Sequence, residues 1–139
     1  MLGNFPYSID AKGRVFIPSK FREKQGEEFI LIKNVKHKCI NVFSPHEWEE
    51  YMSKLKTLPK LKTDDIMRYL CSSAAEVTCD SQGRVVVPQE LREFAGLEKE
   101  VMIIGIENRG EIWSVENWNA YNESLSEASI LAALEELDF

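Results

Sequence analysis

The sequence predicts an α+β fold made of two tandem copies of one unit, in the order strand, tight turn, strand and short helix. The main observation is a repeat, because residues 10–18 read DAKGRVFIP and residues 80–88 read DSQGRVVVP. The match continues at the same spacing into a later helix, which holds Trp48 in the first copy and Trp118 in the second. A repeat of this length defines the architecture before any single element is assigned.

Each copy centres on a four-residue turn between two strands. In the first copy one strand ends near Asp10 and the next begins at Arg14. Asp10 can accept backbone N–H bonds and Gly13 can take the positive φ of a bulged hairpin, so we expect the two strands to form a hairpin. We assign Gly13 a conformational role only. Pro18 ends the second strand, and a short helix follows over residues 19–25. The equivalent residues of the second copy are Asp80, Gly83, Arg84 and Pro88.

The remaining elements complete each copy. In the first copy two strands lead to a helix that begins at Ser44, with Pro45 in its first turn and Glu47 completing a capping box. A polar joint over residues 59–62 precedes a helix that opens at Thr63. The expected segments are a first repeat over 1–58, a connecting helix over 59–73, a second repeat over 74–122 and an acidic C-terminal helix over 123–139.

The C-terminal segment has a pattern of its own. Ser124 with Glu127 is typical of a capping box, and Ile130, Leu134 and Leu137 fall on one helical face. Two interpretations stay open: a solvated acidic helix, or a helix whose apolar face docks on a neighbouring subunit.

Size and composition favour one globular domain. A chain of 139 residues can bury a modest core, whereas half of it would be marginal, so we expect the two halves to pack on each other. The N-terminus has no basic region followed by a long apolar stretch, and no apolar run reaches membrane-spanning length. We therefore expect a cytoplasmic protein with no membrane partner.

The charge distribution matters more than the net charge of −6. Residues 1–38 carry eight basic and four acidic side chains, whereas residues 116–139 carry six acidic side chains and no basic one. An acidic total is therefore compatible with a basic working face. The basic side chains around the first turn and its helix are Lys12, Arg14, Lys20, Arg22 and Lys24.

The sequence favours no catalytic or metal site. Three cysteines make an odd count, and we expect reduced, mostly buried thiols. His37 and Cys39 with His46 could form part of a metal site, but no second close pair of ligands completes it. Neither a Ser-His-Asp order nor a phosphate-binding glycine loop is present. We expect no enzyme activity, no metal, no cofactor and no small-molecule substrate.

The paired turns resemble those of the MraZ family of bacterial transcriptional regulators, which carry two D-x-x-x-R motifs per chain. The resemblance runs from Met1 to about Tyr121, and the wider relationship is to AbrB-type and MazE-type swapped-hairpin DNA-binding domains. It implies a β-barrel of two interleaved hairpin units about a pseudo-two-fold axis, with peripheral helices. It also implies a ring-shaped homo-oligomer in the nucleoid. The expected partner is double-stranded DNA, at short direct repeats upstream of the division and cell-wall gene cluster that includes the family's own gene.

Within this resemblance the turn side chains are the candidates for DNA contact. A guanidinium suits bidentate contact with guanine or phosphate, so we favour DNA contact for Arg14, with Lys12 beside it as a point charge. Arg84 has Gln82 in place of the lysine, which predicts that the first turn dominates. Arg22 could reach a phosphate or pair with a local acid. The candidates for DNA contact are Lys12, Arg14, Gln82, Arg84 and Arg22, and those for turn structure are Asp10, Gly13, Asp80 and Gly83.

A second class of function stays open. A MazE-like antitoxin or protein-interaction module would use the acidic, leucine-bearing tail, although such antitoxins usually carry one motif. The aromatic residues at matched helical positions indicate core or subunit packing rather than stacking on bases. They are Trp48, Tyr51, Trp118 and Tyr121.

Overall fold

The structure, a computed structural model, describes residues 1–137. In chain order its elements are β1 (Leu2–Ser8), β2 (Arg14–Phe16), α1 (Ser19–Gln25), β3 (Glu28–Asn34), β4 (Cys39–Phe43), α2 (Pro45–Leu55), α3 (Lys60–Cys71), β5 (Ala75–Thr78), β6 (Arg84–Val86), α4 (Gln89–Ala95), β7 (Glu100–Ile106), β8 (Gly110–Ser114), α5 (Val115–Ser124) and α6 (Glu127–Glu135).

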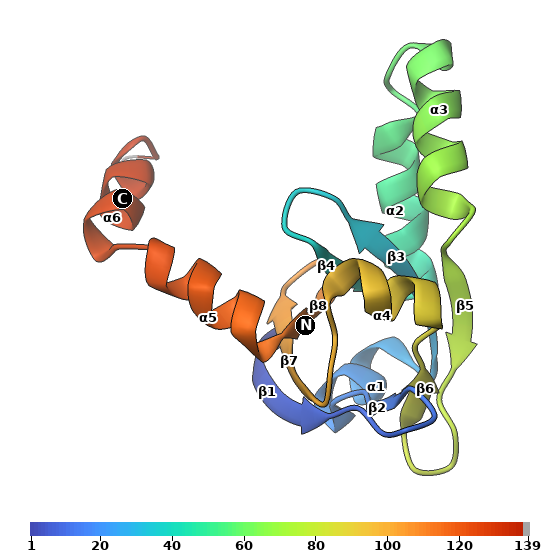
Figure 1. The fold of residues 1–139 in the computed structure, drawn as a ribbon. Coiled ribbons are helices and arrows are strands. Elements are labelled where there is room, and N and C mark those ends of the chain that lie inside the picture. Colours follow the sequence, from blue (N-terminus) through green and yellow to red (C-terminus); the bar gives the residue numbers. More distant parts are fainter. Residues whose placement is uncertain (138–139) are drawn as a thin grey trace.

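The strands form one large antiparallel sheet and one short ribbon. The large sheet has six strands in the order β1-β7-β8-β4-β3-β5, and the ribbon pairs β2 with β6. Helices accompany both repeats, so the predicted α+β class is confirmed (Figure 1). Within residues 1–137 the hydrogen-bonded order ends at β1 and at β5, so the closed barrel stays a prediction.

The strands that flank each turn pair across the repeats and not with each other. β1 pairs with β7, β2 with β6, and β5 with β3. The predicted hairpins are therefore wrong, although the turn itself is closed by Asp10 N donating to Arg14 O at 3.0 Å. Alternation of apolar residues specifies which face of a strand is buried but leaves the partner strand open.

The pairing is symmetric under exchange of the two repeats. Val15 lies opposite Val85 in the ribbon, and Asn41 lies opposite Glu111 in the large sheet. Both pairs join equivalent positions of the two copies. Each repeat thus supplies half of a shared core, which explains how two marginal halves form one stable unit.

The core consists of a central cluster and two lateral ones. Val15 and Val85 belong to the central cluster, where both are almost fully buried. In the lateral clusters the ring of Tyr51 stacks on Phe43 at 4.8 Å and that of Tyr121 on Trp113 at 5.3 Å. Trp48 and Trp118 pack beside them, so the prediction that these matched aromatic residues serve packing is confirmed.

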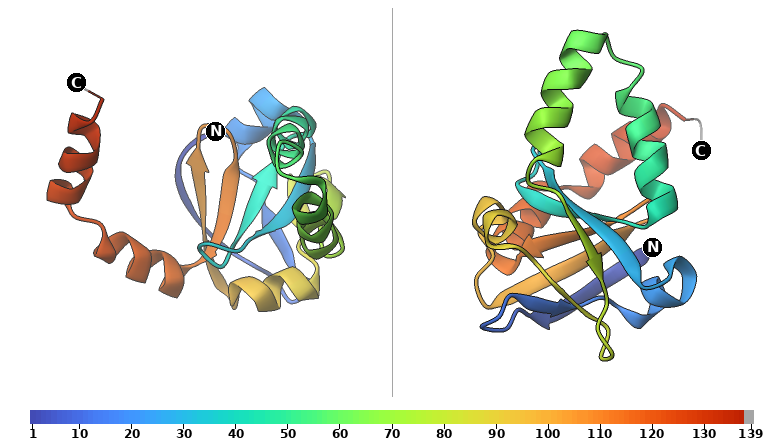
Figure 2. Two further views of the ribbon diagram at one scale, coloured as in Figure 1. Left: turned by 90° about the horizontal axis from the view of Figure 1, so that it is seen from above. Right: turned by 90° about the vertical axis from the view of Figure 1, so that its right-hand side faces the viewer.

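Two helical projections leave the sheet. The first is the hairpin of α2 and α3, and the second is an arm of α5 and α6 that extends away from it (Figures 1 and 2). The predicted capping box of Ser44 and Glu47 is present at the start of α2. The connecting helix begins at Lys60 and not at Thr63, because Pro59 directly precedes it and the Thr63 hydroxyl donates to nearby carbonyls. Pro59 is the residue before the helix, in an extended conformation with ψ 141°, and its fixed φ is compatible with that position.

The arm begins differently from the prediction. Ser124 is the last residue of α5, and α6 is capped by Ser126, whose hydroxyl accepts from Ser129 N at 3.1 Å. The predicted box of Ser124 with Glu127 is therefore wrong, because extended Leu125 separates two helices. The last two positions of the predicted C-terminal helix, 138 and 139, lie outside the described residues.

In the part of the chain that the structure describes, no helix has both the length and the apolar character needed to span a membrane. The cysteines are all free, with Cys39 buried, Cys79 half-buried and Cys71 exposed, so the prediction of mostly buried thiols is wrong. Burial raises the pKa of the Cys79 thiol to about 11.

Candidate nucleic-acid interface

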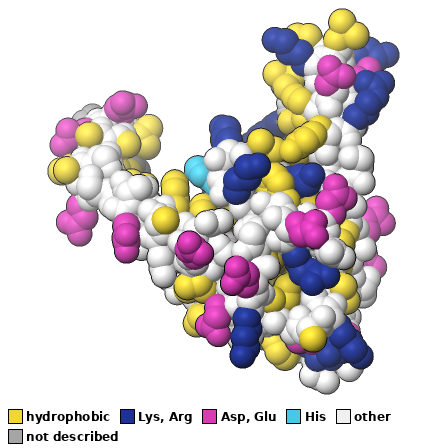
Figure 3. Space-filling model, in the orientation of Figure 1, with side chains coloured by type: hydrophobic (Ala, Val, Ile, Leu, Met, Phe, Trp, Pro, Cys, Tyr) yellow, Lys and Arg dark blue, Asp and Glu magenta, His cyan; other side chains and the backbone are white. Residues whose placement is uncertain are grey.

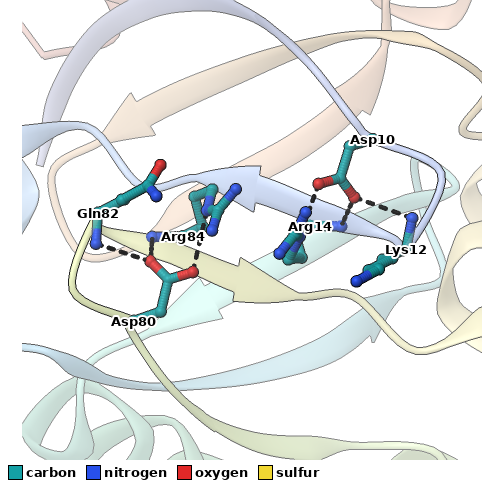
Figure 4. A network of polar contacts seen from close by, with 6 residues as sticks. All are labelled: Asp10, Lys12, Arg14, Asp80, Gln82 and Arg84. Carbon is teal, nitrogen blue, oxygen red and sulfur yellow. Dashed lines mark hydrogen bonds and ion pairs between the residues drawn. The ribbon is translucent and has the colours of Figure 1, made fainter.

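The first turn is fastened by the carboxylate of Asp10. Its Oδ1 accepts from the backbone N–H groups of Lys12 at 3.0 Å and Arg14 at 2.8 Å, and its Oδ2 accepts from Arg14 Nε at 2.6 Å (Figure 4). Gly13 N donates to Asp10 O at 2.9 Å, with Gly13 at φ 80°. An Asp side chain that accepts backbone N–H groups further along a turn is a usual way to hold one.

The second turn repeats this arrangement. Asp80 Oδ1 accepts from Gln82 N and Arg84 N, both at 2.9 Å, and Oδ2 accepts from Arg84 Nε at 2.9 Å. The structure thus places both motif aspartates at the centre of the hydrogen bonds of their turns.

These bonds keep both carboxylates ionised. The backbone N–H of Arg14, followed by the Arg14 side chain and the Lys12 N–H, lowers the pKa of Asp10. The backbone N–H groups of Arg84 and Gln82 lower the pKa of Asp80 in the same way. A hydrogen bond to a charged group favours the charged form, so each turn carries a fixed negative charge beneath its arginine.

Each motif arginine keeps part of its guanidinium available. Arg14 and Arg84 use only Nε in their bonds to the aspartates, and within residues 1–137 no hydrogen bond uses their Nη atoms. A guanidinium held at one edge can present its other donors to a planar acceptor. The geometry is therefore suited to contact with a base edge or a phosphate.

The ribbon has an outward face that was not predicted from the sequence. Val15 and Val85 point into the core, so the alternate positions on both strands point outward. Phe16, which is 39% exposed, lies opposite Arg84, and Val86, which is 52% exposed, lies opposite Arg14. We call Arg14, Phe16, Arg84 and Val86 the ribbon face. The alternation between Arg14 and Phe16 was the signal that could have revealed it.

The turns are braced by arginines from the opposite repeat. A Cβ atom added at Gly83 would lie 2.6 Å from Cζ of Arg22, and one at Gly13 would lie 3.1 Å from Cζ of Arg92. The Nε atoms donate to Ile17 O at 3.2 Å for Arg22 and to Val87 O at 2.9 Å for Arg92. The purely conformational role predicted for the glycines is therefore wrong, because each also admits a guanidinium that a side chain would displace.

The structure divides the predicted DNA-contact residues into two groups. Lys12 and Gln82 are exposed in the two turns, which lie at opposite ends of the ribbon from which Arg14 and Arg84 project (Figure 4). Arg22 packs against Gly83 of the second turn, and its Nη1 is 3.7 Å from Oε1 of Glu27.

The residues considered for a metal site lie in separate surroundings. The ring of His37 lies 4.9 Å from that of Tyr121, whereas His46 Nε2 lies 3.0 Å from Glu50. Over residues 1–137, no three His, Cys, Asp or Glu side chains gather in a way that could hold a metal ion.

Fold and site together define a class: a duplicated α+β protein whose interleaved repeats present two aspartate-fastened arginine turns. The family described as "MraZ protein, putative antitoxin-like" matches residues 1–67 and 70–138. The chain is 47% identical to a protein of Acetivibrio thermocellus, over 92% of each chain. It is 44% identical to one of Thermoanaerobacter sp., over 99% of this chain and 96% of the relative.

A protein of Carboxydothermus hydrogenoformans is 48% identical, over 86% of this chain and 85% of the relative. All three relatives bear the name "Transcriptional regulator MraZ". The chain belongs to the MraZ family, and the shared name supports a role in transcription regulation.

Proposed function

We propose that this protein is a sequence-specific DNA-binding regulator of the division and cell-wall gene cluster, acting at short direct repeats upstream of its own gene. In this proposal the ribbon face meets the DNA, Arg14 and Arg84 contact base edges, and Lys12 and Gln82 contact the backbone. Its place of action is the nucleoid.

The observation that carries the proposal is the state of the two motif arginines. Each is held at Nε by an ionised aspartate, while its Nη atoms are uncommitted within residues 1–137. A pre-positioned guanidinium gives up little side-chain freedom on binding, and a bidentate contact with guanine distinguishes that base from the others.

The proposed role of Arg22 is that of a brace and not of a contact. Its Nε donates to Ile17 O, and its guanidinium packs against Gly83 of the other repeat. A residue in this position supports the geometry of the second turn. We also propose that the chain is divided into the four segments expected from the sequence and that its strands form a closed barrel.

A ring-shaped oligomer would increase the affinity of such small contact sites. One ribbon offers few contacts, but linked ribbons act at high effective concentration. Successive subunits of a cyclic assembly present the same face in the same direction, which suits direct repeats, whereas a two-fold dimer suits a palindrome.

A footprint of the protein on DNA upstream of its own gene tests the proposal. We expect protection at regularly spaced direct repeats, weakened by Arg14→Ala and unaffected by Leu2→Asp, which changes an exposed residue outside the ribbon face. Uniform protection of all DNA, or none, would contradict sequence-specific binding.

The second candidate is an antitoxin-like protein-interaction module. The exposed apolar residues of α6 favour it, and so does the wording of the family description. A protein that gave no footprint but bound a toxin through α6 would support this alternative.

A further inference from the structure

The arm of α5 and α6 carries an apolar surface that nothing in the described chain covers. No residue of either helix is buried, and Figures 1 and 2 show α6 standing away from the sheet. The exposed side chains that line the hollow at its bend, of about 920 Å³, include Leu125, Ile130, Leu131 and Leu134, which we call the arm face.

Such a helix requires a partner. α6 has nine residues, and isolated helices shorter than about 12–15 residues are marginal in water. Helices of this length gain their stability from burial of an apolar face, and α6 has that face without the burial.

The other projection offers a surface of matching character. A groove of about 370 Å³ lies between the α2–α3 hairpin and the turn that joins β3 to β4. Its lining combines apolar side chains with cations and contains no carboxylate: Val35, Lys36, Tyr51, Leu55, Ile66 and Arg109 are among its residues. We call it the hairpin groove.

The two surfaces are complementary in charge. The arm carries Glu116, Glu123, Glu127, Glu135 and Glu136 and no basic residue. At the rim of the groove Lys36 is exposed and makes no ion pair within residues 1–137. The hairpin helices carry both signs, with Lys54 and Lys62 but also Glu49, Glu50, Asp64 and Asp65, so the positive character belongs to the lining and rim of the groove. Figure 3 shows the same contrast, with acidic and apolar side chains on the arm and Lys and Arg side chains beside a hollow below α3.

We propose that the arm face of one copy of this chain docks in the hairpin groove of a second copy. This inference rests on the oligomer in the proposed function and deepens it by naming the two surfaces. The contact joins two different surfaces, so it is heterologous and can continue from copy to copy until a ring closes. Both turns lie on the opposite side of the molecule from the hairpin, so docking leaves the ribbon face open (Figure 1).

Two exposed double variants test the pairing. The arm variant is Ile130→Asp with Leu134→Asp, and the groove variant is Val35→Asp with Lys36→Glu. Leu2→Asp is the matched control, because it puts a charge on an exposed apolar residue outside both surfaces. Light scattering after size-exclusion chromatography gives the molar mass, and thermal unfolding verifies that each variant is folded.

We expect the wild type and the control to form the large assembly and each variant alone to be a monomer. An equal mixture of the two variants retains one intact arm and one intact groove per pair, so it should form heterodimers and nothing larger. Heterodimers would support the proposal.

Three results would overturn it. A groove variant that assembles like the wild type would show that arms pair with arms or with another surface. A mixture that stays monomeric would show that the surfaces do not fit. A wild type that is monomeric at every concentration would show that the arm folds onto its own chain or meets a different partner.

The outcome is separable from that of the proposed function. If the arm and groove variants still form the large assembly and the wild type still gives a footprint, only the docking proposal is refuted. A wild type that assembles as predicted but gives no footprint would refute only the DNA-binding role.

Discussion

The two turns share their internal hydrogen bonds and differ in what they present to solvent. Asp10 and Asp80 accept the same three hydrogen bonds. The lengths of equivalent bonds differ by 0.3 Å at Oδ2 and by less at Oδ1. The motif D-x-x-x-R therefore accounts for the shape of the turn. What the turn contacts depends on the residues that the motif leaves open.

Those open positions favour the first turn. Lys12 stands where the second turn has Gln82, and the Arg14 side chain is 30% exposed against 18% for Arg84. Arg84 also has its Cζ 6.0 Å from the ring centre of Phe16, which ties it to the protein. The helices do not extend this contrast, because Arg22 of α1 packs against Gly83 of the second turn and Arg92 of α4 packs against Gly13 of the first.

The largest effect is expected for Arg14→Ala. Loss of a bidentate base contact is worth roughly 1–3 kcal/mol at one site, and linkage of subunits multiplies the loss. Binding to the upstream DNA, measured by fluorescence anisotropy, should weaken at least tenfold, while Arg84→Ala weakens it less. Equal losses for the two variants would contradict the dominance of the first turn, and a matched loss of thermal stability would assign Arg14 to the turn alone.

Because Arg22 packs more closely against Gly83 than Arg92 does against Gly13, a side chain added at the second turn should lower stability more than one added at the first. Gly83→Ala should lower the free energy of unfolding by more than Gly13→Ala, because the Cβ would lie 2.6 Å from the Arg22 guanidinium against 3.1 Å for Arg92. Gly26→Ala is the matched control, since Gly26 has φ 85° and open space around its Cβ position. Gly26→Ala should cost only the strain of its backbone conformation, with φ 85° and ψ −164°, which is about 1–3 kcal/mol. Urea unfolding of the three variants would reveal the order, and equal losses would mean that the guanidiniums move aside freely.

The aspartates should behave alike in both turns. Their pKa values are lowered by backbone N–H groups, so each contributes stability above its unfolded value, near 3.8, that is lost as the pH falls through the lower folded value. Asp10→Ala and Asp80→Ala should each lower the melting temperature at pH 7 and reduce its fall below about pH 4. A series of melting curves from pH 7 to pH 3 measures this, and an effect confined to one turn would break the equivalence.

The smallest effect concerns the phosphate contacts. Lys12→Gln should make the dependence of log affinity on log salt shallower by about 0.9, and Gln82→Lys should make it steeper by a similar amount. The two variants are reciprocal, so each controls for the other. Unchanged slopes in both would place the turn tips away from the DNA backbone.

Contacts between residues close in sequence could be predicted, whereas contacts between residues far apart in sequence could not. The bonds from Asp10 to Lys12 and Arg14 span at most four residues, and the box of Ser44 with Glu47 spans three, so spacing alone predicted them. Pairing of β2 with β6 joins positions some 70 residues apart, and period-two alternation carries no information about the partner.

The same limit explains the missed contacts. In the sequence Arg22 resembles a phosphate-binding residue, because the neighbouring residues do not indicate that it packs against the distant Gly83. Phe16 and Val86 can be recognised as part of a shared surface only when the two strands are paired, because the pairing places them on one outward face with the motif arginines.

We propose that the ribbon face contacts DNA, with most contacts made by the first turn. A structure of the protein bound to its upstream repeats would test this. We expect Arg14 within hydrogen-bond distance of a base edge, Lys12 beside a phosphate, and the α2–α3 hairpin turned away from the duplex. A complex in which the DNA lies on another surface, with the ribbon face open to solvent, would contradict it.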